Sequence, residues 1–225
     1  MKRSAILGYR LGVVLGLALM VILFVPAQQS WLTRGPANIG HESLGCQDCH
    51  QPAPGSIRQQ LQANVRYWLG QRTTPVDFGH QSVTNSACFT CHDNPKDRHP
   101  VDRFTEPRFA EVRALIHPEQ CVSCHREHQG VRVTNVEPTY CQHCHQEITL
   151  ANDPLDVPHS KLIADQNWSS CLTCHDYHSN HDMQLPTRLA AAPDPAQIVR
   201  YFQGGPSPYP GKTFYPAKKK EGSQP

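Results

Sequence analysis

The longest apolar run in the chain lies at its amino-terminal end. Leu11–Val25 is uninterrupted by charge and follows a basic start at Lys2 and Arg3. The run alone is shorter than the roughly 20 residues that a spanning helix needs. Mostly apolar residues precede it, however, and the long side chain of Arg10 can reach the membrane surface. The pattern predicts an N-terminal apolar helix between residues 5 and 27.

This segment has the features of an export signal and also those of a membrane anchor. Val25-Pro26-Ala27 offers small residues where a signal peptidase cuts. Trp31 stands where an interfacial aromatic residue belongs if the helix is retained. We expect a retained anchor in a bacterial inner membrane, with the rest of the chain facing the periplasm by the positive-inside rule. The alternative is a soluble periplasmic protein after cleavage.

Three later segments show apolar residues at helical spacing. The first begins after a capping box at Ser56 and stops at Gly70, and it carries Trp68 on its apolar face. The others begin near Thr105 and at Asp194. The segments between them show no clear hydrophobic periodicity. The pattern predicts a mostly irregular fold with a few short α-helices, whose apolar faces we expect to pack on a cofactor or on one another.

The composition argues against a large apolar core. The chain has 20 prolines among 225 residues and a hydrophobic fraction of 38%. A compact fold therefore needs another source of apolar surface.

All ten cysteines belong to five copies of Cys-x-x-Cys-His. The first cysteines are Cys46, Cys88, Cys121, Cys141 and Cys171, and the second are Cys49, Cys91, Cys124, Cys144 and Cys174. This motif attaches c-type haem through two thioethers. Zinc sites and disulfides also use cysteine pairs, but an odd number of pairs, each followed by histidine, favours haem. We predict five covalently bound haems that form the core of a compact multihaem c-type cytochrome.

The histidine of each motif is placed to ligate iron from one face. These proximal histidines are His50, His92, His125, His145 and His175. Methionine is nearly excluded as the sixth ligand, because only Met183 lies outside the amino-terminal segment. Nine further histidines are available among the 14 in the chain.

One spare histidine precedes each motif. We therefore predict His41, His80, His117, His128 and His159 as distal ligands. His117 lies too close to Cys121 to fold over its own haem and would reach a neighbour's. His178 and His181 are the strongest substitutes, ahead of His99 and His143. Two histidines per iron leave no open position, and such low-potential haems are suited to passing electrons.

The segment Cys121–Gly130 and the repeated upstream histidine resemble class III-type multihaem cytochromes over residues 41–181. In that family the spare histidines are distal ligands. The chain also resembles small pentahaem carriers that feed periplasmic nitrite reductase and, with an anchor, the pentahaem subunit of alternative complex III. It departs from membrane-anchored quinol dehydrogenase cytochromes, because no methionine follows the first motif.

These features predict an electron relay, not an enzyme. We expect it to connect a membrane, quinol-linked donor with a periplasmic redox partner, as a subunit of a respiratory complex. A quinol dehydrogenase is the alternative, and an oxyanion reductase is a further one that would need a five-coordinate haem. No interleaving of basic and aromatic residues indicates nucleic-acid binding.

The chain divides into three parts. We expect a signal or anchor over residues 1–30, the pentahaem domain over 31–181 and an extension over 182–225. The extension is rich in proline, glycine and aromatic residues. It would lie along the haem domain or across a partner subunit.

Overall fold

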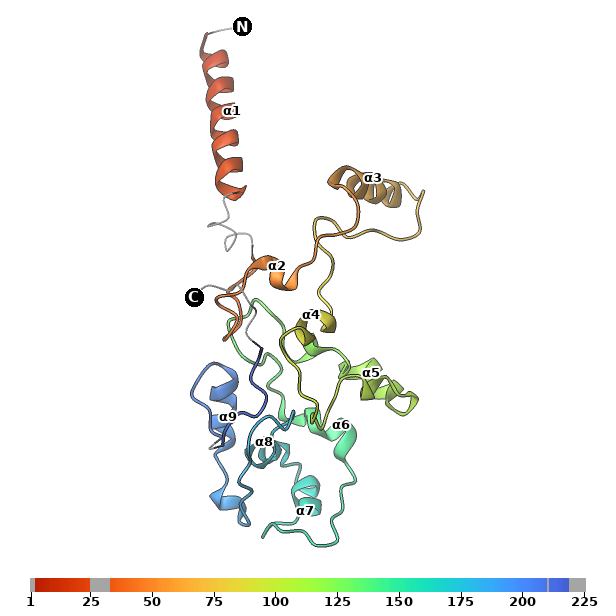
Figure 1. Ribbon diagram of the computed structural model, residues 1–225, viewed down its shortest axis with the longest axis vertical. Helices are drawn as coiled ribbons and strands as arrows, with labels where there is room; N and C mark the ends of the chain where they lie inside the picture. The colour runs from red at the N-terminus through yellow and green to blue at the C-terminus, as the bar shows by residue number, and fades with distance from the viewer. Residues whose placement is uncertain (1–2, 25–32, 210, 219–225) are drawn as a thin grey trace.

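The computed structural model describes residues 3–24, 33–209 and 211–218 (Figure 1). Its α-helices are α1 (Arg3–Phe24), α2 (Cys46–Cys49), α3 (Ile57–Trp68), α4 (Asn85–Phe89), α5 (Ala110–Ile116), α6 (Gln142–His145), α7 (His159–Ala164), α8 (Cys171–Cys174) and α9 (Pro195–Phe202). Single 3₁₀ turns are η2 (Arg103–Thr105), η3 (Pro107–Phe109), η4 (Cys121–Ser123), η5 (Pro138–Cys141), η6 (Trp168–Ser170) and η7 (Leu189–Ala191). The described part contains no strand, and the prediction of an irregular fold with short helices is confirmed in that respect.

The helix α1 extends away from the body of the molecule (Figure 1). Among the residues that the structure describes, no helix combines the length and the apolarity needed to cross a membrane. The predicted anchor therefore gains no support and stays a prediction. Its cleavage site at Val25–Ala27 and its interfacial Trp31 lie outside the described residues.

The predicted helix after Ser56 forms as α3. Ser56 accepts a hydrogen bond from the backbone of Gln59, and the Gln59 side chain accepts one from the backbone N–H of Ser56. This reciprocal pair satisfies two amides at the helix start. Gly70 follows the end with a φ of 71°, a left-handed conformation that favours glycine. The helix forms as predicted, but its apolar face does not pack on the rest of the chain.

The second predicted helix is broken near its start. Pro107 opens the turn η3, and α5 begins only at Ala110. The helix ends at His117, whose φ of 47° is left-handed and whose next residue is Pro118. The interruption at Pro107 therefore explains why a short α5 replaces the longer predicted helix.

The carboxyl-terminal extension lies along the body. The side chain of Asp194 caps α9, as the sequence predicted. The guanidinium of Arg132 donates to the carbonyls of Tyr201 and Gly205. Further on, the backbone N–H of Lys218 donates to the carbonyl of Cys91. The extension is thus placed against segments from the second and third motifs.

Few apolar side chains are buried in the described structure. They are Ala53, Phe104, Trp168, Ile198 and Tyr209. At the centre is instead a cavity of about 1580 Å³, lined by residues from all five motifs and from α9. A chain that leaves this much space among its segments is suited to enclosing a large apolar cofactor.

Candidate haem sites

The motifs share a local conformation that brings the histidine back over the first cysteine. The histidine N–H donates to the carbonyl of the first cysteine at 2.8–2.9 Å in the first, second, third and fifth motifs. In the fourth motif, α6 continues through His145. This i to i−4 turn holds two sulfurs and one imidazole near each other, as a covalently attached haem requires. We number the sites 1 to 5 in the order of the motifs.

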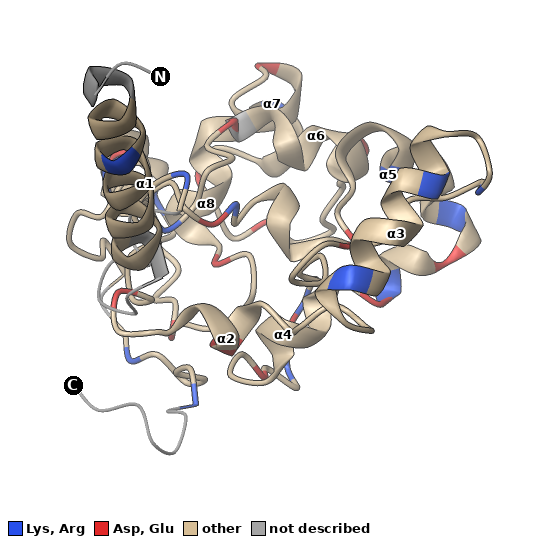
Figure 2. Cartoon of the chain, turned by 90° about the horizontal axis from the view of Figure 1, so that it is seen from above, with Lys and Arg blue, Asp and Glu red and all other residues tan. Residues whose placement is uncertain are grey.

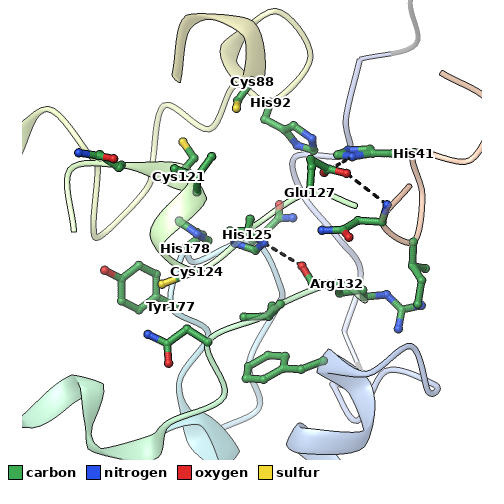
Figure 3. Close-up of a pocket in the computed structure, with 18 of the residues that line it drawn as sticks. His41, Cys88, His92, Cys121, Cys124, His125, Glu127, Arg132, Tyr177 and His178 are labelled. Carbon is green, nitrogen blue, oxygen red and sulfur yellow. Dashed lines mark hydrogen bonds and ion pairs between the residues drawn. The ribbon is translucent and has the colours of Figure 1, made fainter. Parts of the chain in front are cut away.

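Every proximal histidine lies near the ring of at least one other histidine. The centroid separations are 5.9 Å for His92–His41, 6.2 Å for His125–His178, 6.1 Å for His145–His99, 6.1 Å for His175–His159, 6.1 Å for His50–His80 and 6.3 Å for His50–His128. Figure 3 shows two of these pairs, His92 with His41 and His125 with His178.

These separations match the spacing that an intervening metal would impose. A metal–imidazole bond is about 2.0 Å and a ring nitrogen lies about 1.2 Å from its centroid, so two opposed imidazoles have centroids about 6.4 Å apart. Rings in direct contact would approach more closely, as His99 and Tyr177 do at 4.2 Å. The donor set and its spacing therefore fit a haem iron with two axial histidines.

The second histidine of most pairs is oriented through its Nδ1 atom. The Nδ1–H of His41 donates to Glu127, that of His178 to Asp97 and that of His159 to Asp153, at 2.6–2.9 Å. That of His99 donates to the carbonyl of Tyr177 at 2.7 Å. Hydrogen bonds of this kind fix the ring and leave Nε2 available, which is the arrangement of most metal-binding histidines.

The proximal histidine of site 3 is held in the same way, since the Nδ1–H of His125 donates to the carbonyl of Arg132 at 2.9 Å (Figure 3). The backbone of Arg132 and its neighbour Val133 in turn donates to the carbonyl of Phe202 on α9. The carboxyl-terminal extension thus supports a ligand of site 3.

Burial favours the form that binds metal in four of the proximal imidazoles. It lowers the pKa of His92, His125, His145 and His175. Iron takes a neutral imidazole, so this direction favours ligation. His41 differs, because its hydrogen bond to Glu127 raises its pKa. Burial alone would raise the pKa of Glu127, but hydrogen bonds from His41 and from the backbone of Asn38 outweigh it and lower that pKa.

Site 1 has two candidate second ligands. His80 lies on the chain that returns beside the first motif, where it forms an isolated antiparallel bridge with Pro52. His50 is therefore a diagonal neighbour of His80, and such residues have Cα atoms only roughly 7–8 Å apart. His128 instead comes from a separate segment, lines the cavity together with Cys46, Cys49 and His50, and has a buried Nδ1 with no hydrogen-bond partner.

The remaining histidines are placed otherwise. His117 is predicted as a distal ligand, but the structure puts it at the exposed end of α5 beside Glu119, 3.4 Å from its carboxylate. His143 contacts Tyr140. His181 donates to Asp176 at 2.7 Å and packs against Tyr209. None of these three lies beside a proximal histidine in the part of the chain described.

The sites are close to one another. The helix α2 contacts α4, and α4 contacts η4, which brings the first three motifs together. A hydrogen bond between Cys88 and Cys121 raises the pKa of the former thiol and lowers that of the latter to about 7. Cys141 and Cys171 form a second such pair, which lowers the pKa of Cys141 to about 7. Sulfurs of the second and third motifs, and of the fourth and fifth, are thus neighbours.

Site 3 connects with site 4 through aromatic residues. Tyr140 hydrogen-bonds to Cys124, and its ring lies 6.5 Å from that of Tyr177. Tyr177 in turn stacks on His99, whose ring lies edge-on to that of His145.

All ten cysteines are described and none forms a disulfide.

Two histidines of these ring pairs, His99 and His178, are not among the five predicted distal ligands, and sequence reasoning finds none of the three carboxylates beside the pairs. His178 follows the last motif, and His99 shares the segment before the third motif with His117, so local spacing favours neither. Glu127 and Asp97 contact histidines more than 80 residues away, so no local spacing could reveal them. Asp153 lies six residues before His159, and this short spacing was the one available signal.

Five Cys-x-x-Cys-His turns with paired histidine rings have the features of a multihaem c-type cytochrome. The family model described as cytochrome c3 matches residues 71–146, which contain the second, third and fourth motifs. This match supports covalently bound c-type haem and electron transfer rather than catalysis. Neither the curated proteins nor the solved structures provide a match.

Proposed function

We propose that this protein is a pentahaem electron relay in which each iron has two axial histidines. The observation that carries the proposal is the set of histidine ring pairs, one or more for each motif, at 5.9–6.3 Å. Bound haem supplies a one-electron iron couple, and the chain supplies ligation, spacing and burial. Two strong ligands on each iron leave no position for a substrate.

The ring pairs support an assignment of the ligands. We propose His50 with His128, His92 with His41, His125 with His178, His145 with His99, and His175 with His159. Three of the distal ligands expected from the sequence are kept, His41, His128 and His159. His99 and His178 take the places of His80 and His117.

For site 1 the geometry favours His128 over His80. Opposed axial imidazoles place their Cα atoms roughly 12 Å apart, because two metal bonds and two side chains separate them. A diagonal neighbour on an adjacent antiparallel segment is much closer than that. His80 therefore lies beside His50, whereas His128 reaches the cavity from a different segment.

A pair of substitutions tests this assignment. His128→Ala should convert one haem to high spin, and His80→Ala should leave all haems low-spin in electron paramagnetic resonance spectra. The opposite result would transfer the ligand role to His80. A mass spectrum of each variant should still show five haem additions, because the cysteines are untouched.

The order of the sites supports a linear path for electrons. Contacts between motifs run from site 1 through site 2 to site 3, then through Tyr140 and Tyr177 to site 4, and from Cys141 to Cys171 at site 5. We propose that sites 1 and 5 are the two ends of the relay. Each end would then face a different redox partner.

The partners and the location are part of the proposal. Haem c attachment outside the cytoplasm and the apolar amino-terminal segment support a periplasmic haem domain. The resemblance to pentahaem respiratory subunits supports a quinol-linked membrane donor and a periplasmic acceptor. N-terminal sequencing of the mature protein tests whether residues 1–30 are retained as an anchor, and a chain beginning at Gln28 would contradict retention.

The central test is the count and spin state of the haems. We expect five haem additions by mass spectrometry and low-spin ferric signals for all of them. A substantial high-spin population in the intact oxidised protein would instead indicate an open coordination position and a catalytic haem.

A further inference from the structure

The helix α3 is packed with its polar face inward. The side chain of Gln60 is 3% exposed, and it donates to the carbonyls of Ala53 and Gly55 and accepts from the N–H of Gly79. One turn further on, Asn64 exchanges hydrogen bonds with the backbone of Val76 in both directions. Amide side chains therefore hold this helix to the loop that follows it.

The apolar face of the same helix points to solvent. Its exposed fractions are 57% for Ile57, 51% for Leu61, 39% for Val65, 75% for Trp68 and 66% for Leu69. Residues one helical turn apart lie on one face, so these side chains form a single stripe. We call this stripe the α3 face.

The central cofactors do not account for the α3 face. The cavity lining has no residue between His50 and Val83. Figure 1 shows α3 standing apart from the segments that carry the motifs. A contiguous apolar stripe of this size on a protein surface usually marks an interaction site.

The charges around the α3 face indicate what it meets. Arg58, Arg66 and Arg72 are exposed on or just after the helix, and Asp77 is the one acidic residue between positions 51 and 82. Figure 2 shows basic segments along α3. Exposed arginines on and beside a stripe that holds tryptophan and leucine are typical of helices that lie in the interface of an anionic bilayer. Tryptophan at the exposed end adds an interfacial anchor.

We propose that the α3 face binds the surface of a membrane containing anionic phospholipid. The apolar side chains enter the boundary between head groups and acyl chains, and the arginines contact phosphate. Burial of the stripe removes apolar surface from water, and the nearby arginines are attracted to the negative surface.

The two ends of the segment that carries α3 are hydrogen-bonded to each other beside the first motif. Ala53 donates to the carbonyl of Gly79 at 2.9 Å, and Gln81 donates to that of Gln51 at 2.8 Å. Since Gln51 directly follows His50, membrane contact through α3 would hold site 1 near the lipid surface. This consequence rests on the proposed function, whereas lipid binding itself does not.

Hydrogen–deuterium exchange of the full-length holoprotein tests the proposal. Exchange in residues 57–69 is compared without vesicles, with phosphatidylcholine vesicles, and with vesicles that also contain phosphatidylglycerol. We expect the anionic vesicles to slow exchange in this segment by about tenfold or more, because membrane contact suppresses local opening. Neutral vesicles should have a smaller effect.

Variants separate the α3 face from other membrane contacts. The double variant Trp68→Gln with Leu69→Gln should lose the protection, while Arg58→Gln with Arg66→Gln should lose the preference for anionic vesicles. Leu115→Gln is the matched control, because Leu115 is 70% exposed on α5 and should leave protection unchanged. The helix α1 is present in all of them.

Two results would overturn the proposal. One is equal exchange of residues 57–69 with and without anionic vesicles. The other is protection that persists in the Trp68→Gln, Leu69→Gln variant. Protection by an acidic redox protein, without any by vesicles, would assign the face to a protein partner and reject the lipid. Haem spectra recorded on the same samples report separately on the relay.

Discussion

Sites 2 and 5 pair the same types of residue. The residues of site 5 lie near one another in the chain, whereas those of site 2 come from distant segments. In site 5 the facing histidines, His159 and His175, are 16 residues apart in the chain, and the carboxylate that orients His159 comes from Asp153, six residues before it. In site 2 the ring facing His92 belongs to His41, and its carboxylate comes from Glu127, 86 residues further on.

The difference concerns what each site holds together. The elements of site 5 follow one another, from α7 through η6 to α8, so few long loops must close before the site forms. Site 2 joins a segment before the first motif, the second motif and a segment after the third. We infer that site 5 is a local unit and that site 2 fastens three distant parts of the chain.

The largest expected effect comes from removing a haem attachment. Cys88→Ala with Cys91→Ala should accelerate hydrogen exchange by about tenfold or more in the segments around Asn38, the second motif and Glu127. Cys171→Ala with Cys174→Ala should do so mainly between residues 153 and 191. The buried apolar side chains are too few to compensate for a lost cofactor.

Exchange measured by mass spectrometry on both holoprotein variants makes this comparison. If removal of site 2 accelerates hydrogen exchange only within the second motif, site 2 does not hold distant segments of the chain together. If exchange accelerates equally across the whole chain in both variants, site 5 is not a local unit.

A smaller effect is expected from single distal ligands. His41→Ala and His159→Ala should each convert about one fifth of the haem to high spin in electron paramagnetic resonance spectra, because one iron loses an axial imidazole. His117→Ala is the control and should change nothing, since His117 lies beside Glu119 on the surface. Low-spin spectra for His41→Ala would reject the assignment for site 2.

The smallest effect is expected from the carboxylates behind the ligands. Glu127→Gln and Asp153→Asn should each raise the reduction potential of one haem, because a neutral partner no longer stabilises the oxidised iron through the imidazole. A tenfold change in the reduction equilibrium corresponds to about 59 mV for one electron. Spectroelectrochemical titration measures the shift, with Asp165→Asn as the control because Asp165 pairs with Lys161 on the surface.

The carboxylate variants also sharpen the comparison between the sites. The Asp153 side chain is 14% exposed and that of Glu127 is 33% exposed. Water screens the more exposed charge more strongly, so we expect the larger potential shift at site 5. An equal or reversed order would show that topology, not exposure, governs how these carboxylates act.

The sequence by itself determined the chemistry and the local structure. Spacing within each motif depends on residues a few positions apart, so the haem attachment and proximal histidines could be predicted without a fold. The same holds for α3, whose capping box at Ser56 and stop at Gly70 are local signals. The distal role of His41 and His159 stays a prediction; the structure places their rings beside those of His92 and His175, a pairing that the sequence did not supply.

Only the tertiary structure decided which histidines meet. His99 and His178 face proximal rings because Tyr177 and Asp97 hold them there, and these partners lie 78 and 81 residues away. His117 follows the local rule but points to solvent at the end of α5. The orientation of α3 was undecided for the same reason, since amphipathic spacing fixes a face but not what lies against it. Local spacing encodes local turns, whereas contacts between distant segments depend on how the whole chain closes around its cofactors.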